Sequence, residues 1–112
     1  MADKRTPLYE EHLKSQARMV SFAGWEMPIQ YKGIKEEHAC VRQNVGLFDV
    51  SHMGEIFVRG PQALSTLQWL TSNDVSKVQA GQAQYNLLTN PEGGIVDDII
   101  IYCLNPGEEY LV

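Results

Sequence analysis

The residues from 95 to 104 form the most restrictive segment of this sequence. Apolar side chains occupy both odd and even positions there, and the interruptions are Asp97 and Asp98. Because successive residues of a strand point to opposite faces of a sheet, a strand of this kind is expected to be covered on both faces. The chain is therefore expected to build a sheet in which this strand is buried.

A turn motif directly precedes this segment. Asn90-Pro91-Glu92-Gly93 carries Asn, Pro and Gly at the first, second and fourth positions, as type I turns prefer. The motif predicts a hairpin between strands at 84–89 and 95–104. If the four turn residues set the register, Tyr85 lies opposite Asp98.

Helices and shorter strands are predicted around this hairpin. Apolar residues recur at steps of three and four in segments 6–18, 34–45 and 61–71, which predicts helices, the first with Thr6 as its N-cap. The second helix is expected to have Ile34, His38, Val41 and Val45 on one face, and the third is expected to bury Ala63, Leu64, Leu67 and Leu70. Strands are predicted at 19–22, 53–59 and 109–112, and an irregular apolar segment at 25–31. This alternation indicates an α+β fold with a mixed or antiparallel sheet.

The charge of the chain argues against some partners. With 9 Lys and Arg against 14 Asp and Glu the formal net charge is -5, and no basic cluster is present, so nucleic acid is not an expected partner.

No apolar stretch has membrane-spanning length, and the first residues have neither signal-peptide nor transit-peptide character. We therefore expect a cytoplasmic bacterial protein, or a processed form in the mitochondrial matrix. The histidines and cysteines share no metal-ligand spacing, so no metal is expected.

Asp97 and Asp98 need separate explanations, because neighbouring strand residues point to opposite faces. An ionised carboxylate among apolar side chains is costly unless hydrogen bonds or an opposite charge compensate it. In the predicted register one face carries Tyr85, Leu87, Asp98, Ile100 and Tyr102. Such a surface suits a planar, amine-bearing ligand. From the residues alone, a local bond to a turn or a backbone amide is the commoner explanation for either Asp, and both interpretations stay open.

Several stretches of the sequence resemble one known family. The three longest stretches are residues Gly46 to Glu55 (GLFDVSHMGE), Gly94 to Tyr102 (GIVDDIIIY) and Phe22 to Tyr31 (FAGWEMPIQY). Ser72-Asn73-Asp74 is a shorter one. They resemble the glycine cleavage T-proteins, which are tetrahydrofolate-dependent aminomethyltransferases. The resemblance spans nearly the whole chain but only about the first third of the usual family length.

The resemblance implies a reaction and a set of site residues. It implies transfer of an aminomethyl carbon from the dihydrolipoyl arm of H-protein to tetrahydrofolate, giving 5,10-methylenetetrahydrofolate and ammonia without a metal. Asp98 is implied as the acidic residue near the reacting nitrogens, either as a base or as an orienting group. The positions that match folate-lining residues are Met53, Phe57, Tyr85, Ile100, Tyr102 and Val112. Asp97 and His52 are interpreted as structural residues.

The resemblance also implies a three-domain fold around a folate channel. Residues 1–50 would begin a discontinuous α+β domain, and residues 51–112 would begin a second, ferredoxin-like domain. Because the resemblance implies that other site residues of the family lie beyond Val112, we expect the isolated chain to lack transferase activity and to bind folate weakly or not at all. The alternatives are a non-catalytic folate-binding relative and another folate-dependent demethylase or dehydrogenase module.

Overall fold

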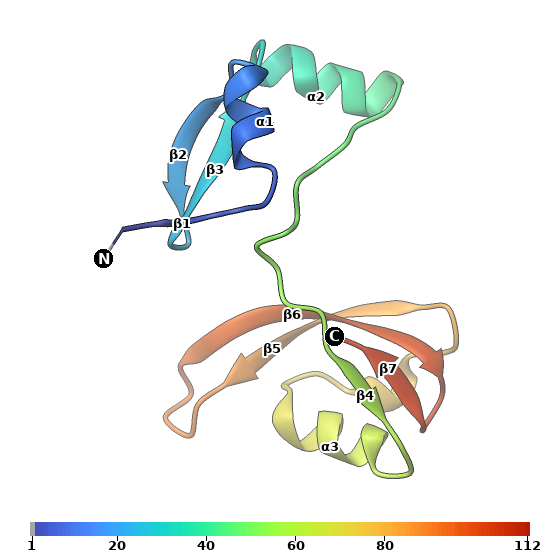
Figure 1. Cartoon of the computed structure of the whole chain (residues 1–112). Coiled ribbons are helices and arrows are strands. Elements are labelled where there is room, and N and C mark those ends of the chain that lie inside the picture. Colours follow the sequence, from blue (N-terminus) through green and yellow to red (C-terminus); the bar gives the residue numbers. More distant parts are fainter. Residues whose placement is uncertain (1) are drawn as a thin grey trace. The chain divides into compact units, whose positions relative to one another are not determined.

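The computed structural model describes residues 2–112, which divide into two compact units, residues 2–53 and residues 54–112 (Figure 1). Each unit combines helices with its own sheet, so the expected α+β class is confirmed. The division after Met53 falls close to the predicted domain boundary at 50, whereas the ferredoxin-like assignment stays a prediction. No helix among the described residues has the length and apolar character needed to cross a membrane.

The first unit contains a mixed three-stranded sheet. Its strands are β1 (Lys4–Arg5), β2 (Arg18–Phe22) and β3 (Trp25–Gln30), in the order β1-β3-β2. β1 runs parallel to β3, and β2 runs antiparallel to it. The predicted strand at 19–22 is therefore confirmed as part of β2.

The prediction of an irregular segment at 25–31 is wrong, because β3 is a regular strand despite Pro28. Pro28 lies beyond the β1 pairs, which involve Trp25 and Glu26, so one side of β3 is an open edge there. On the other side Pro28 pairs with Met19, next to a register shift in β2. Proline is tolerated at edges and irregularities because its missing N–H then removes no ladder hydrogen bond.

The helices of the first unit are α1 (Tyr9–Lys14) and α2 (Ile34–Gln43). α1 is shorter than predicted, and Thr6 is a buried residue of the preceding turn instead of its N-cap. α2 lies within its predicted range, but it carries no buried residue, so no element of this chain buries its apolar face. Periodicity identifies the residues that share a face and does not identify what covers them.

The second unit is an antiparallel sheet with one α-helix. Its elements in chain order are β4 (Phe57–Arg59), α3 (Ala63–Leu70), the short 3-10 helix η1 (Val75–Lys77), β5 (Ala83–Thr89), β6 (Ile95–Asn105) and β7 (Glu109–Leu111). The strand order is β4-β7-β6-β5. The predicted strand at 53–59 is thus reduced to its last residues.

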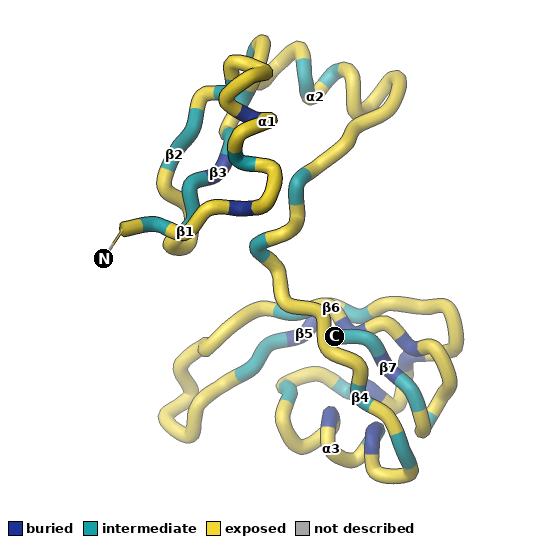
Figure 2. The backbone as a smooth tube through the Cα atoms, viewed as in Figure 1, coloured by how far each residue is buried: buried dark blue, intermediate teal, exposed yellow. Residues whose placement is uncertain are grey.

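One face of this sheet packs on α3 and forms the core of the unit (Figure 2). The buried cluster consists of Ala63, Leu67, Val75, Val78, Ile101, Cys103 and Tyr110. Leu70, expected in the buried stripe of α3, is 44% exposed. The prediction that β6 is covered on both faces is also wrong for this chain, since Ile101 is fully buried whereas Ile100 and Tyr102 are exposed.

The turn of the β5–β6 hairpin has one more residue than predicted. Gly93 N–H donates to the Asn90 carbonyl at 3.0 Å, as in the expected turn. However, the residue pair that closes the loop is Asn90 and Gly94, because Asn90 N–H donates to the Gly94 carbonyl at 2.9 Å. Gly93, at φ 82°, adopts the left-handed conformation that this extra position requires. The loop therefore shifts the pairing by one residue.

A second one-residue shift occurs between Leu88 and Thr89. Together the two shifts place Leu87, and not Tyr85, opposite Asp98, so the predicted register is wrong. A displacement of two residues preserves the face to which each side chain points. Tyr85 and Asp98 consequently remain on the same face, as diagonal neighbours.

Candidate functional site

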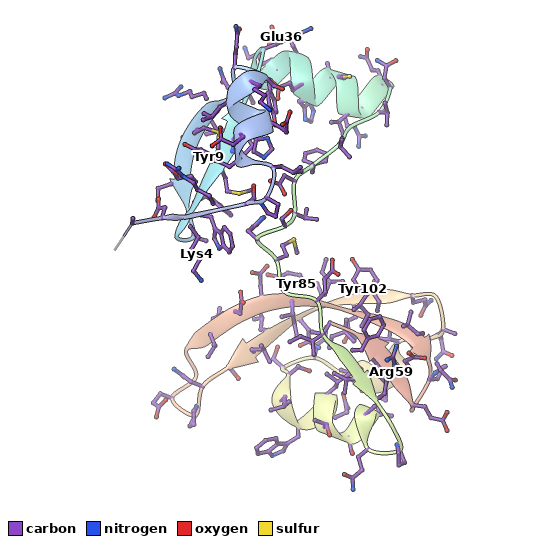
Figure 3. The ribbon with its side chains drawn as sticks, in the orientation of Figure 1. Lys4, Tyr9, Glu36, Arg59, Tyr85 and Tyr102 are labelled. Atoms are coloured by element: carbon purple, nitrogen blue, oxygen red, sulfur yellow. The ribbon has the colours of Figure 1, made fainter. Side chains whose placement is uncertain are left out.

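The sheet face of the second unit that lies opposite α3 carries most of the predicted site residues. Phe57 pairs with Leu111, and Leu111 pairs with Tyr102, so these three form one row across the sheet. Ile100 and Asp98 follow Tyr102 on the same face of β6, paired with Tyr85 and Leu87. We call this surface the outer sheet face, defined by Phe57, Tyr85, Leu87, Asp98, Ile100, Tyr102 and Leu111. Figure 3 shows Tyr85 and Tyr102 on the side of the sheet away from α3.

The outer sheet face is open in this chain. Tyr85 is 61% exposed and Phe57 is 53% exposed. Asp98 is also exposed, as is Asp97, so neither carboxylate is buried among apolar side chains in this chain. Because side chains along a strand alternate between faces, the sequence correctly predicted apolar neighbours for the Asp98 carboxylate. No residue among 2–112 covers it, however.

Asp98 has one side-chain partner on this face. The Tyr85 hydroxyl donates to Asp98 Oδ2 at 3.2 Å. Partial desolvation and this carboxylate raise the pKa of Tyr85 above its usual value. The hydroxyl therefore stays protonated near neutral pH and keeps donating to Asp98, while Oδ1 forms no hydrogen bond within the described residues.

Asp97 has a local role. Its Oδ1 accepts a hydrogen bond from the Asp98 backbone N–H at 3.0 Å. It pairs with Leu88, on the opposite side of the sheet from the Leu87–Asp98 pair. This arrangement agrees with the structural interpretation of Asp97 and separates its carboxylate from that of Asp98.

Asn86 anchors β5 behind the outer sheet face. It is a buried polar residue, 1% exposed, and its Oδ1 accepts from the Asn73 backbone N–H at 2.9 Å. Its Nδ2 donates to Thr71 Oγ1 at 3.1 Å. These bonds tie the loop after α3 to β5, which gives Tyr85 a fixed backbone from which to project.

Two of the predicted lining residues lie apart from the others. Val112 exchanges backbone hydrogen bonds with Ile56 and packs against the buried core cluster, on the α3 side of the sheet. Met53 belongs to the first unit, where its backbone N–H donates to the Val50 carbonyl at 2.9 Å. The structure therefore brings together Phe57, Tyr85, Asp98, Ile100 and Tyr102, and the roles of Val112 and Met53 stay predictions.

Arg59 is a residue on this face that the sequence analysis did not identify. Its guanidinium lies 4.2 Å from the centroid of the Phe57 ring, and its Nε donates to Glu109 Oε1 at 2.5 Å. Phe57 and Arg59 are two apart on β4, so strand alternation already predicted that they share a face. The ion pair and the stacking together hold the Phe57 ring at the edge of the outer sheet face.

Other features of the described residues do not form a competing site. A surface hollow of about 710 Å³ lies over α3, lined by residues that include Pro61, Leu64 and Trp69, and none of the predicted site residues borders it. No group of three or more His, Cys, Asp or Glu side chains within residues 2–112 is arranged to hold a metal ion.

Comparison with known proteins identifies the family. The family model described as GCVT N-terminal domain matches residues 8–112. This chain belongs to that family. The strands β4 to β7, which build the outer sheet face of this chain, all fall inside the matched residues.

Individual relatives agree with this assignment. An aminomethyltransferase from Bdellovibrio bacteriovorus is 65% identical over 109 residues, and one from Thermus thermophilus is 59% identical over 109 residues. These matches cover 97% of this chain but 30% and 31% of the relatives. The glycine cleavage system aminomethyltransferase T from Bartonella henselae has a similar structure, with a TM-score of 0.82 and 40% identity over 96% of this chain and 30% of that one. The chain thus spans about a third of the length of these proteins.

Proposed function

We propose that this chain is part of an aminomethyltransferase of the glycine cleavage system. The activity would transfer an aminomethyl carbon from the dihydrolipoyl arm of H-protein to tetrahydrofolate, giving 5,10-methylenetetrahydrofolate and ammonia. The observation that carries the proposal is the family match over residues 8–112, together with relatives such as an aminomethyltransferase that is 65% identical. We also propose a cytoplasmic location, or the mitochondrial matrix for a processed form.

The side chains of the outer sheet face support tetrahydrofolate as the ligand in this proposal. Tetrahydrofolate combines flat rings with ring N–H donors, and this face offers the aromatic rings of Phe57, Tyr85 and Tyr102 beside the aliphatic side chain of Ile100. Asp98 supplies a carboxylate beside these rings, whereas the Glu109 carboxylate at the edge of the face is paired with Arg59. The described residues therefore fit one wall of a folate site, and the opposite side of that site is open among residues 2–112.

Each residue has a distinct task in this proposal. Asp98 Oδ1 accepts a hydrogen bond from a ring N–H or takes a proton, while Oδ2 is held by the Tyr85 hydroxyl. Tyr85 thereby fixes the direction in which the carboxylate presents its other oxygen. Phe57, Ile100 and Tyr102 provide apolar contact area and exclude water from the ring surface once the site is closed.

The experiment is the substitution Asp98→Asn in the polypeptide that contains this sequence. Rates with lipoylated H-protein and tetrahydrofolate, and the equilibrium dissociation constant for tetrahydrofolate, are measured side by side. We expect turnover to fall by about 100-fold or more, because proton transfer and charge-assisted orientation by one side chain are worth that much. Unchanged turnover in the variant would contradict a catalytic role for Asp98.

Asp97→Asn is the matched control. It makes the same chemical change one residue away, on the opposite side of the sheet, and leaves an amide oxygen that can still accept from the Asp98 backbone N–H. We expect its turnover to remain within about threefold of the parent, a factor that corresponds to less than about 1 kcal/mol. A loss as large as that of Asp98→Asn would indicate a general effect on β6.

A second candidate function is folate binding without catalysis. The outer sheet face favours neither candidate, because aromatic walls and one carboxylate serve binding and catalysis alike. The non-catalytic candidate predicts that the parent protein binds tetrahydrofolate but shows no transfer from H-protein. In both cases we expect the isolated 112-residue chain to bind folate weakly and to lack transferase activity, because its folate face is open.

A further inference from the structure

The segment 44–53 of the first unit contains neither helix nor strand, yet one polar side chain in it is buried. The Asp49 side chain is 2% exposed. In contrast, the large apolar residues around it are exposed, namely Val45, Leu47, Phe48 and Val50. Burial of apolar surface therefore does not explain what holds this segment in place within the described chain.

A hydrogen-bonded chain of side chains provides the attachment. Asp49 Oδ2 lies 2.8 Å from His12 Nε2, and His12 Nδ1 lies 2.8 Å from the Tyr31 hydroxyl. An ionised carboxylate can only accept, so Nε2 carries the hydrogen and Nδ1 is free to accept from Tyr31. These two hydrogen bonds connect three separate segments: α1, the residues after β3, and the segment 44–53.

The other oxygen of Asp49 shapes the turn that follows. Oδ1 accepts a hydrogen bond from the Ser51 backbone N–H at 2.9 Å. The next turn bond runs from Met53 N–H to the Val50 carbonyl at 2.9 Å. Asp49 therefore links the buried attachment to the backbone geometry of residues 50–53.

The charged state of Asp49 is favoured although the side chain is buried. Burial alone would raise the pKa of the carboxyl, but hydrogen bonds from Ser51 and His12 outweigh that effect and hold it well below its usual range. Thr6 Oγ1 also lowers this pKa, although it forms no hydrogen bond of good geometry with the described residues. A buried carboxylate with these partners is difficult to detach without protonating it.

We propose that Tyr31, His12 and Asp49 form a clasp that fixes the segment 44–53 against the first unit and so positions Met53. A second contact supports the same segment, since the His52 ring meets the Phe22 ring edge-on, with centroids 6.0 Å apart. His52 Nδ1 is buried without a hydrogen-bond partner in the described residues, so His52 contributes packing here. These are positioning residues, and their consequence for folate rests on the proposed function, through the predicted role of Met53.

Amide hydrogen exchange of the 112-residue chain tests the clasp without any ligand. His12→Leu removes both hydrogen bonds at similar size, and we expect the Ser51 and Met53 amides to exchange at least about tenfold faster, while the β2–β3 ladder keeps its protection. His12→Gln retains one donor and one acceptor and is expected to restore much of the protection. His38→Leu, on the exposed surface of α2, is the matched control and is expected to change neither region.

Two results would overturn the clasp. One is unchanged exchange at Ser51 and Met53 in His12→Leu, and the other is an equal loss of protection throughout the β2–β3 ladder, which would indicate only general stability. If His12→Leu does not fold, Tyr31→Phe decides, because it removes a single hydroxyl. Its expected acceleration at the Ser51 and Met53 amides is about threefold or more, and an unchanged rate would reject the proposal.

A folate titration separates this inference from the proposed function. It uses the polypeptide that contains this sequence, with and without Tyr31→Phe, and tetrahydrofolate as the probe. Weaker binding together with faster exchange supports both the clasp and the role of Met53. Faster exchange with unchanged affinity supports the clasp and rejects its consequence for folate, and no binding by the parent protein counts against the proposed function alone.

Discussion

Asp98 and its neighbours lie on one sheet face because a strand alternates, and this followed from the sequence. The cross-strand partner of Asp98 did not follow from the sequence, because a three-residue loop and a second register shift moved the pairing by two residues. Either shift alone would have turned Tyr85 away from Asp98. The predicted grouping of side chains survived only because the two shifts add to an even number.

At the residue scale, the strongest acid dependence is expected from Asp49. Its pKa is lower in the folded chain than the usual value of 3.8, so its contribution to stability is complete above that value and is lost as the pH falls toward the folded pKa. We expect the unfolding free energy of the first unit to decrease below about pH 4. Urea unfolding at a series of pH values, followed through β2–β3 amide signals, measures this decrease.

The variant Asp49→Asn provides the control for this pH dependence. It has no carboxyl to titrate, so its unfolding free energy is expected to depend less on pH in the same range. At neutral pH we expect the variant to be less stable by about 2 to 3 kcal/mol, because it replaces a buried, ionised acceptor of hydrogen bonds from His12 and Ser51. An identical acid slope in parent and variant would assign the effect to other carboxylates.

At the element scale, β6 shows that the apolar pattern of a strand does not determine which of its faces is covered. Its apolar residues at both odd and even positions predicted two covered faces, but within this chain α3 covers only the face that contains Ile101 and Cys103. The sequence of a strand shows which faces are apolar, and the elements that cover them are chosen elsewhere in the chain.

Two neighbouring isoleucines of β6 test this difference. Ile101→Ala is expected to lower the unfolding free energy of the second unit by about 2 to 4 kcal/mol, because it leaves a cavity in the core. Ile100→Ala, on the outer sheet face, is expected to cost less than about 1 kcal/mol. Urea unfolding monitored by circular dichroism compares the two variants, and equal losses would mean that the outer sheet face is covered in solution.

Pro28 is an element-scale feature that sequence analysis misjudged. A proline within an apolar run argues against a strand, and the structure accommodates it through a short β1 and a register shift in β2. Neither of these features can be recognised from residues 25–31. They depend on which strands become neighbours.

At the scale of the whole molecule, each unit contains its own sheet and its own packed contacts. We expect a core substitution in one unit to reduce protection mainly in that unit. Hydrogen exchange of Ile101→Ala should therefore show faster exchange in the β5–β6 ladder and little change in the β2–β3 ladder. Equal acceleration in both ladders would show that the chain unfolds as one cooperative unit.

The sequence by itself determined the α+β class, the positions of most helices and strands, the family and the set of residues that share a face with Asp98. These features depend on local spacing and turn chemistry, which are written in contiguous residues. The tertiary structure decided the register of the hairpin, the exposure of Asp98, the separation of Val112 from the outer sheet face and the burial of Asp49 against His12. Each of these requires contacts between segments far apart in the chain, and periodicity carries no information about such contacts.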